Sequence, residues 1–206
     1  MEVPKLKKLT KESNNKYCNL YTVDYDFNGK NVHYYFVSRN DLKANELQIT
    51  KTNGVRILPY FEENDECFIV LIKEFRYPLN KFIYALPAGM VEKDEDVRQT
   101  AERELREEIG AVVEEIELVS NTNFVSAGLT DEALCHFVAK VRMSDMQNLD
   151  ANEVIEPLII NLKNAISFVN THEFCALSCE MIKCFYYKYN YEKVLKHLKE
   201  TNFEIK

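Results

Sequence analysis

The chain has 206 residues, a formal net charge of −7 and 46% hydrophobic residues. A chain of this length and apolar content can bury the core of one ordinary domain, which excludes an intrinsically disordered protein. The negative charge argues against a protein that binds duplex nucleic acid, because such binding requires a basic surface. A small nucleotide is compatible with this charge, since a bound divalent cation can reverse the sign of an acidic pocket.

The N-terminal residues contain no apolar segment that would act as a signal peptide. No stretch of the chain approaches the ~18 apolar residues that a membrane-spanning helix needs. We therefore expect a cytoplasmic protein that has neither nucleic acid nor a membrane as its partner.

The first third of the chain is predicted to form antiparallel strands. Apolar and polar residues alternate over residues 17–38 around Asn28-Gly29, a dipeptide that fits a tight type I′ hairpin turn. Shorter runs of the same kind follow at residues 47–52, 55–61 and 68–72. The segment between the hairpin and the next strand is the only plausible boundary, so we expect an N-terminal β extension of residues 1–45 and a main domain of residues 46–206.

The pattern changes after Gly89, where residues 94–109 are rich in helix formers and end at Gly110, a residue typical of helix ends. Further strands are predicted at residues 116–121, 133–141 and 154–161. Helices are predicted at residues 162–171 and 175–200. Strands flanking a central helix, with helices at the end of the chain, indicate an α+β protein.

Carboxylates of the central helix lie on its inward face in this prediction. At about 100° per residue, Glu104 and Glu108 fall within roughly 20° of Val97, on the apolar side of the helix. Two buried carboxylates four residues apart repel each other and lose their hydration, so they need compensation. A divalent cation such as Mg²⁺ supplies it, because it prefers carboxylate oxygens and shares its coordination shell with substrate phosphates. Glu107 flanks the pair, and Arg103 is placed to form an ion pair with it.

The segment that contains this helix resembles the Nudix box, G-x5-E-x7-R-E-U-x-E-E-x-G-U, where U is a bulky aliphatic residue. The matching residues are Gly89, Glu95, Arg103, Glu104, Leu105, Glu107, Glu108 and Gly110, and only Ala111 is smaller than the pattern. The resemblance implies an α/β/α sandwich with a mixed sheet. It also implies Mg²⁺ or Mn²⁺ held by Glu104, Glu107 and Glu108, and attack by water on one phosphorus of a nucleoside diphosphate linked to another group.

Segments outside the box are similar to those of ADP-ribose (ADP-sugar) pyrophosphatases. They comprise residues 70–78, 86–89 and 126–132. This similarity implies a homodimer that cleaves ADP-ribose, a small-molecule nucleotide, to AMP and ribose 5-phosphate. Two positions depart from the subfamily pattern: Ala85 replaces its usual glutamate and Ala127 its usual proline. Hydrolysis of another ADP-sugar or a dinucleotide is therefore an alternative, and a non-catalytic nucleotide sensor is another.

The same resemblance suggests residues that bind the substrate. The backbone carbonyl of Ala88 would join the metal shell, and Arg76 would contact the substrate unless it is an ordinary charge on a surface strand. Tyr17 and Tyr34 would clamp the adenine, with hairpin packing as their alternative role. Arg39 follows as a possible phosphate or ribose contact.

The general base is expected outside the box, because the box glutamates serve as metal ligands. In the subfamily it is a glutamate in a loop ahead of a strand, and residues 144–156 form that loop here. Glu153 matches best and Glu156 is the alternative. We expect Glu153 and Glu107 to be the catalytic carboxylates.

Overall fold

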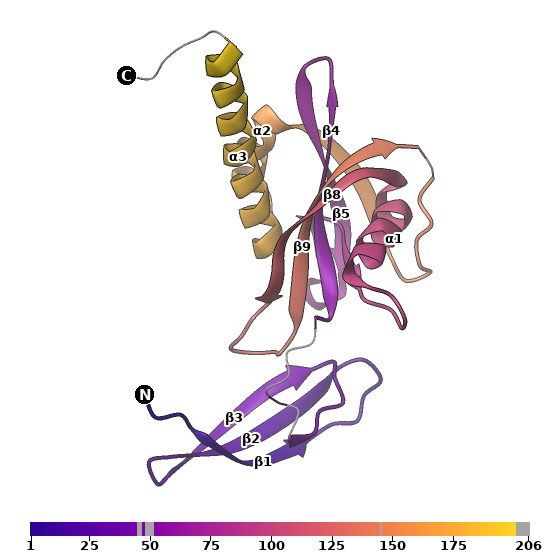
Figure 1. Ribbon diagram of the computed structural model, residues 1–206. Helices are drawn as coiled ribbons and strands as arrows, with labels where there is room; N and C mark the ends of the chain where they lie inside the picture. The colour runs from indigo at the N-terminus through magenta and orange to yellow at the C-terminus, as the bar shows by residue number, and fades with distance from the viewer. Residues whose placement is uncertain (45–46, 48–51, 145, 201–206) are drawn as a thin grey trace. The chain divides into compact units, whose positions relative to one another are not determined.

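The computed structural model describes residues 1–44, 47, 52–144 and 146–200, so the strand expected at residues 47–52 falls almost entirely outside the described residues. The chain divides into two compact units (Figure 1). Unit 1 comprises Met1–Gly54 and Ser120–Cys135, and unit 2 comprises Val55–Val119 and His136–Lys206. We describe each unit by itself.

Unit 1 contains an antiparallel sheet of three strands in the order β1-β2-β3, with β1 at Lys5–Lys11, β2 at Asn19–Phe27 and β3 at Lys30–Ser38. The predicted hairpin is confirmed, since β2 and β3 pair from Asn19 opposite Ser38 to Phe27 opposite Lys30. Asn28 and Gly29 have φ values of 55° and 76°, as the type I′ turn requires. Strand β1 was not predicted, because four lysines in seven residues obscure its apolar alternation.

The segment of residues 126–132 is tied to β3 within unit 1. The Tyr34 hydroxyl donates to the Gly128 carbonyl at 2.7 Å, and the Ser38 hydroxyl donates to Asp131 at 2.9 Å. Tyr21 is fully buried beneath Phe36, with ring centroids 5.5 Å apart. Side-chain hydrogen bonds therefore hold this loop against the small sheet.

Unit 2 is built around a mixed sheet whose main path is β10-β5-β4-β9-β8, with β6 paired to β5 and β7 paired to β4. Helix α1 lies on one side of this sheet, and α2 and α3 lie on the other (Figure 1). The predicted α+β class is confirmed. The elements are β4 (Gly54–Glu63), β5 (Glu66–Arg76), a 3-10 turn (Tyr77–Leu79), β6 (Lys81–Ala85), β7 (Ala88–Met90), α1 (Val97–Ile109), β8 (Ala111–Phe124), β9 (Ala133–Met143), β10 (Ile155–Asn161), α2 (Leu162–Thr171) and α3 (Ala176–Glu200).

Alternation along the central strands separates two buried faces. Leu58 of β4 and Leu71 of β5 join one apolar cluster with Leu162 of α2 and Ile182 of α3. The intervening residues of β5, such as Ile72, point to the opposite face. Both faces are covered, so the central strands are apolar on both sides.

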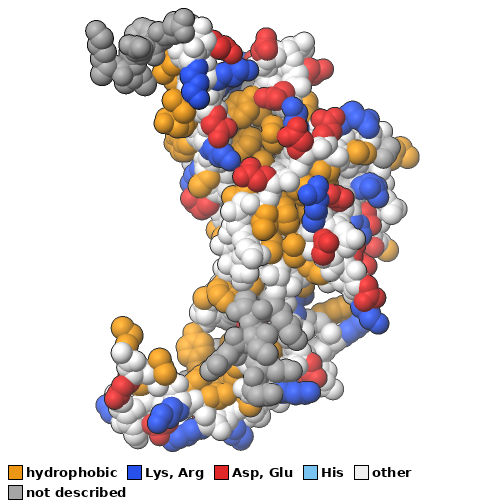
Figure 2. All heavy atoms as spheres, viewed as in Figure 1, with side chains coloured by type: hydrophobic (Ala, Val, Ile, Leu, Met, Phe, Trp, Pro, Cys, Tyr) orange, Lys and Arg blue, Asp and Glu red, His pale blue; other side chains and the backbone are white. Residues whose placement is uncertain are grey.

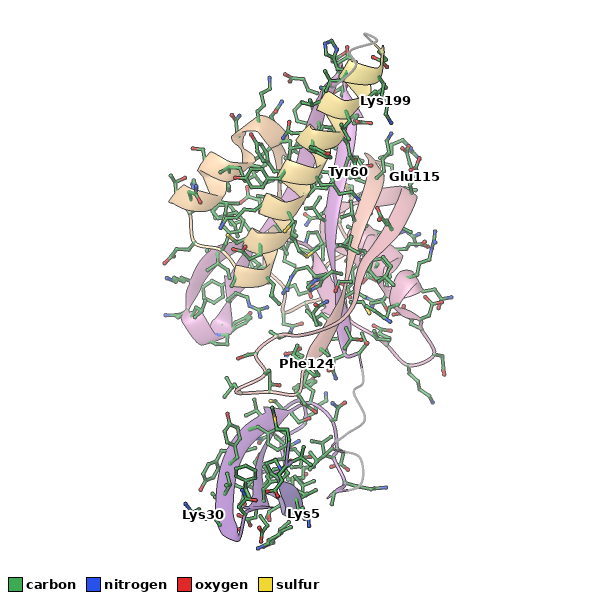
Figure 3. All side chains as sticks on the ribbon, turned by 60° about the vertical axis from the view of Figure 1, so that its left-hand side comes forward. Lys5, Lys30, Tyr60, Glu115, Phe124 and Lys199 are labelled. Carbon is green, nitrogen blue, oxygen red and sulfur yellow. The ribbon has the colours of Figure 1, made fainter. Side chains whose placement is uncertain are left out.

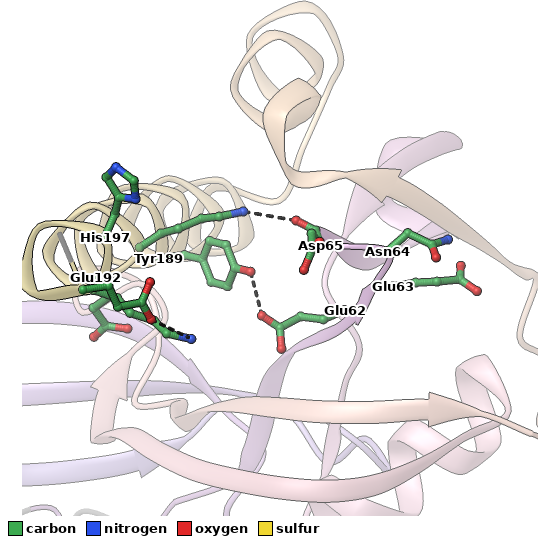
Figure 4. A pocket seen from close by; sticks show the side chains of 10 residues that line it. Glu62, Glu63, Asn64, Asp65, Tyr189, Glu192 and His197 are labelled. Atoms are coloured by element: carbon green, nitrogen blue, oxygen red, sulfur yellow. Dashed lines mark hydrogen bonds and ion pairs between the residues drawn. The ribbon is translucent and has the colours of Figure 1, made fainter.

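Helix α3 runs along β4. The rings of Tyr60 and Phe185 are 5.1 Å apart, and Tyr60 lies beside α3 in Figure 3. One helical turn further on, the Tyr189 hydroxyl donates to Glu62 at 2.7 Å, at the edge of a cavity of about 580 Å³ (Figure 4). No helix within the described residues is long and apolar enough to cross a membrane.

Candidate active site

Helix α1 has well-defined ends that fix its register. The Asp96 side chain caps the N-terminus by accepting hydrogen bonds from the amides of Arg98 at 2.8 Å and Gln99 at 2.9 Å. Gly110 ends the helix in the left-handed conformation, with a φ of 63°. The helix starts three residues later than position 94 of the prediction, because Asp94 has a φ of 71° and cannot join it.

The inward orientation of the two box carboxylates is confirmed, because Glu104 is 8% exposed and Glu108 is 4% exposed. Burial raises the pKa of both carboxyls. The charge of Glu104 raises the pKa of Glu108 further, whereas a hydrogen bond from the Ala88 amide at 3.2 Å opposes this rise. The structure therefore places two costly carboxylates where a cation would stabilise them.

Arg103 is the cation that contacts this cluster. Its guanidinium donates to Glu104 at 2.7 Å, to Glu107 at 2.9 Å and, through Nε, to Glu95 at 2.9 Å. It also donates to the Met90 carbonyl at 3.0 Å, which ties α1 to the end of β7. The predicted pairing of Arg103 with Glu107 is thus present, and the hydrogen bond from Arg103 lowers the pKa of Glu95 to about 2.

Gly89 is required by the close approach of Glu104. A Cβ atom at position 89 would lie 1.7 Å from Glu104 Oε1. Only a residue without a side chain leaves the carboxylate in this position. Gly89 and Glu104 of the motif therefore pack directly against each other.

A cavity of about 320 Å³ opens over these residues. It brings together the predicted Ala88, Glu104, Glu107 and Glu153, while the buried Glu108 contacts the Ala88 amide beside it. The lining is polar and mostly acidic, and consists of Ala88, Gly89, Met90, Glu92, Arg103, Glu104, Glu107, Asp150 and Glu153.

The two candidates for the base lie in different surroundings. Glu153 lines the cavity, and its carboxylate accepts a hydrogen bond from the Asp150 amide at 3.1 Å. The charge of Glu153 contributes to the raised pKa of Glu104 and of Glu108. Glu156, in contrast, has a 76% exposed side chain that is 4.0 Å from Lys73.

Two acidic residues of this region were missed by the sequence analysis. Asp150 lines the cavity from the same loop as Glu153. Glu74 of β5 is largely buried, which raises its pKa, and it accepts a hydrogen bond from Arg76 at 3.3 Å. The period of two that places Ile72 inside the sheet could have placed Glu74 on the same buried face.

The four residues expected to bind substrate do not line this cavity. Arg76 is 55% exposed and bonded to Glu74. The other three belong to unit 1: Tyr17 is 68% exposed, Tyr34 bonds to Gly128, and Arg39 donates to Glu132 at 3.2 Å. Their expected roles stay predictions.

The donor set fits a hard divalent cation. Carboxylate oxygens at the edge of a polar cavity are the ligands that Mg²⁺ and Mn²⁺ prefer. Within the described parts of the chain, no three acidic, histidine or cysteine side chains already converge as a metal cage. The guanidinium of Arg103 instead occupies oxygens of Glu104 and Glu107, so a cation would compete with it for these acceptors.

Comparisons with known proteins agree with this geometry. The model of the Nudix domain family matches residues 50–169, which is more than half of the chain. A putative nudix hydrolase 2 from Caenorhabditis elegans is 31% identical over 134 residues, covering 62% of this chain but only 60% of that protein, less than two thirds of its length. An ADP-ribose pyrophosphatase from Bacillus subtilis is 31% identical over 151 residues, covering 71% of this chain and 80% of that protein.

A solved structure described as an ADP compounds hydrolase has the same fold. It superposes with a TM-score of 0.65 at 16% identity, covering 82% of this chain and 84% of that chain. Together with the family match, these similarities place the sequence motif, the buried carboxylates and the fold in one family. The chain belongs to the Nudix domain family and, within that family, it resembles the ADP-ribose pyrophosphatases.

Proposed function

We propose that this Nudix hydrolase cleaves ADP-ribose to AMP and ribose 5-phosphate with the help of Mg²⁺ or Mn²⁺. The observation that carries the proposal is the cavity in which Glu104, Glu107 and Glu153 meet beside the buried Glu108. The B. subtilis relative is an ADP-ribose pyrophosphatase, which supports the choice of substrate.

The carboxylates of Glu104, Glu107 and Glu108, with the carbonyl of Ala88, would hold the metal. When bound, such a cation neutralises the diphosphate and lowers the pKa of a bound water. In the metal-free site, Arg103 bonds to Glu104, Glu107 and Glu95, so a bound cation would share or replace its hydrogen bonds to the first two carboxylates.

Glu153 is the proposed general base. It is exposed at the cavity, on the loop that precedes β10, and is held there through the Asp150 amide. A carboxylate that does not belong to α1 stays free to accept the proton of the attacking water. Glu156 lacks this position, because it lies on β10 opposite Lys73.

Binding of the nucleoside is assigned to Arg76, Tyr17, Tyr34 and Arg39, as the family resemblance implies. Tyr34 lines an apolar pocket of about 320 Å³ within unit 1, together with Tyr25 and Phe36. Flat aromatic walls suit a nucleobase, which supports the role of Tyr34. Tyr17 does not line this pocket, so its role rests on the family resemblance alone.

We also propose that the protein is a homodimer in which residues 1–45 contact the second copy. Exposed aromatic and aliphatic side chains on the small sheet support this, including Leu20, Val32, Tyr34 and Tyr35. Figure 2 shows apolar side chains among the charged ones at the surface of unit 1. Sedimentation equilibrium at micromolar concentration tests it, and a monomer of 24.2 kDa would contradict it.

The substrate is tested by a hydrolysis screen with Mg²⁺ and with Mn²⁺. The panel comprises ADP-ribose, NADH, ADP-glucose, diadenosine polyphosphates and nucleoside triphosphates. We expect ADP-ribose to give the highest kcat/KM and to yield AMP. A preference for another ADP-sugar or a dinucleotide would contradict ADP-ribose as the substrate but agree with the proposed hydrolysis. Binding without turnover would indicate a nucleotide sensor.

A further inference from the structure

Two buried side chains in unit 2 have polar atoms without partners. Arg56 of β4 is 7% exposed, and its Nε and Nη1 have no hydrogen-bond acceptor in the described structure. His136 of the neighbouring strand β9 is 8% exposed, and its Nε2 is likewise unpartnered. The two groups lie near each other, since burial and then the charge of Arg56 lower the pKa of His136.

The alternation of side chains along β4 assigns Arg56 to the face that α3 covers. Along β4, Glu62 contacts Tyr189, Tyr60 contacts Phe185, and Leu58 shares a cluster with Ile182. Each step of two residues along the strand corresponds to three or four residues back along the helix. The next step leads from Arg56 to the first turn of α3, which begins at Ala176 and contains the fully buried Ser178.

Among the described residues, no carboxylate accepts a hydrogen bond from Nε or Nη1 of Arg56. The first turn of a helix presents free amides and a positive partial charge, which repels a nearby cation. Glu74 is the carboxyl whose pKa Arg56 influences, but it belongs to the opposite face, near α1, and bonds to Arg76. A buried guanidinium in this position is costly unless an anion joins it.

We infer that Arg56, His136 and the first turn of α3 form a binding site for a small oxyanion, such as phosphate, sulfate or a carboxylate. Each edge of the planar guanidinium, Nε with Nη2 or Nη1 with Nη2, presents two parallel N–H donors that match two oxygens of such a group, and each edge of Arg56 has one unpartnered nitrogen. An imidazole nitrogen and the helix amides supply further donors. The site lies across the sheet from the cavity of Glu104 and Glu153, and it does not depend on the proposed function.

The test is thermal unfolding of the full chain in phosphate, compared with chloride at equal ionic strength. An anion that binds only the folded protein raises the midpoint, by about 4 °C or more once its concentration reaches roughly a hundred times its Kd. We expect this shift in the wild type and in the control Arg142→Met, which changes an exposed arginine of β9. We expect its loss in Arg56→Met.

Arg56→Met should also keep or exceed the wild-type midpoint in chloride, because the variant removes an uncompensated buried charge. The second variant, Arg56→Lys, keeps the positive charge but loses the paired N–H donors of the guanidinium. Calorimetric titration with phosphate should show at least ~10-fold weaker binding to this variant. Parallel series with sulfate and acetate separate tetrahedral anions from carboxylates. The inference is overturned if none of the three anions shifts the wild type, or if Arg56→Met responds as the wild type does.

Discussion

The two faces of the unit 2 sheet carry buried charges of opposite sign. On the face near α1, Glu104 and Glu108 are nearly inaccessible, yet Arg103 and the Ala88 amide contact them directly. On the face under α3, Arg56 is equally buried and no described residue accepts from its Nε or Nη1. The carboxylates near α1 have hydrogen-bond donors within the chain, whereas two nitrogens of Arg56 have no acceptor among the described residues.

A buried charge and a sequence motif are therefore separate indications of a functional site. The carboxylates belong to a motif with many fixed positions, and their proposed function rests on family membership. Arg56 stands in an ordinary strand, so only its surroundings in the folded chain distinguish it. Variants on each face can therefore test whether uncompensated charge, rather than the motif, marks a ligand site.

The largest expected effect concerns the base. Glu153→Gln should lower kcat by roughly 10²–10⁴-fold and leave KM nearly unchanged, because the amide cannot accept the proton of the attacking water. Steady-state kinetics with ADP-ribose measure this loss. The matched control is Glu156→Gln, which changes a nearby glutamate on β10. A normal kcat for Glu153→Gln together with a loss for Glu156→Gln would move the role to Glu156.

The next effect concerns the carboxylate that Arg103 orients. Glu104→Gln should lower kcat by at least ~10²-fold, because a neutral amide holds a divalent cation poorly. Glu102→Gln, on the same helix but bonded to Arg98 at 3.1 Å, is the control and should keep its turnover. Near-normal turnover of Glu104→Gln would contradict the metal assignment.

A smaller effect should follow from Gly89→Ala. The added methyl group displaces the flexible Glu104 carboxylate rather than backbone, so the fold should survive and kcat should fall by about 10-fold. Circular dichroism and the metal concentration for half-maximal rate separate the two effects. A large loss of stability without a change in metal requirement would show that Gly89 serves the backbone instead.

The sequence predicted what local periodicity and turn chemistry determine. The hairpin at Asn28-Gly29, the inward Glu104 and Glu108, and the helices after residue 162 appear as expected. Two strands were not predicted, because lysines obscure the alternation of β1 and because the short β7 depends on pairing with the more distant β4.

The candidate site was only partly predictable for a related reason. Its helical half follows from one segment, whereas Asp150 and Glu74 join it through the packing of β10 against β5. Arg56 could not be predicted as buried from its neighbours Val55 and Ile57, because alternation alone permits a solvent-facing residue between them. Burial of both faces of β4 is a property of the assembled sheet and its two helical layers.

The smallest expected effect is on stability, and it compares the two faces directly. The raised pKa of Glu108 means that the metal-free folded state binds a proton more tightly than the unfolded state does. Stability from this group is therefore lost as pH rises from the ordinary value of 4.5 through the raised pKa, so that above the ordinary value the burial of Glu108 opposes folding. Glu108→Gln should remove that penalty and raise the free energy of unfolding by about 1 kcal/mol, since the amide oxygen can still accept from Ala88. Urea unfolding at pH 7 in a chelator measures it, with Glu102→Gln expected to change little. A loss of stability in Glu108→Gln would show that its carboxylate is compensated inside the chain and needs no external cation, unlike the guanidinium of Arg56.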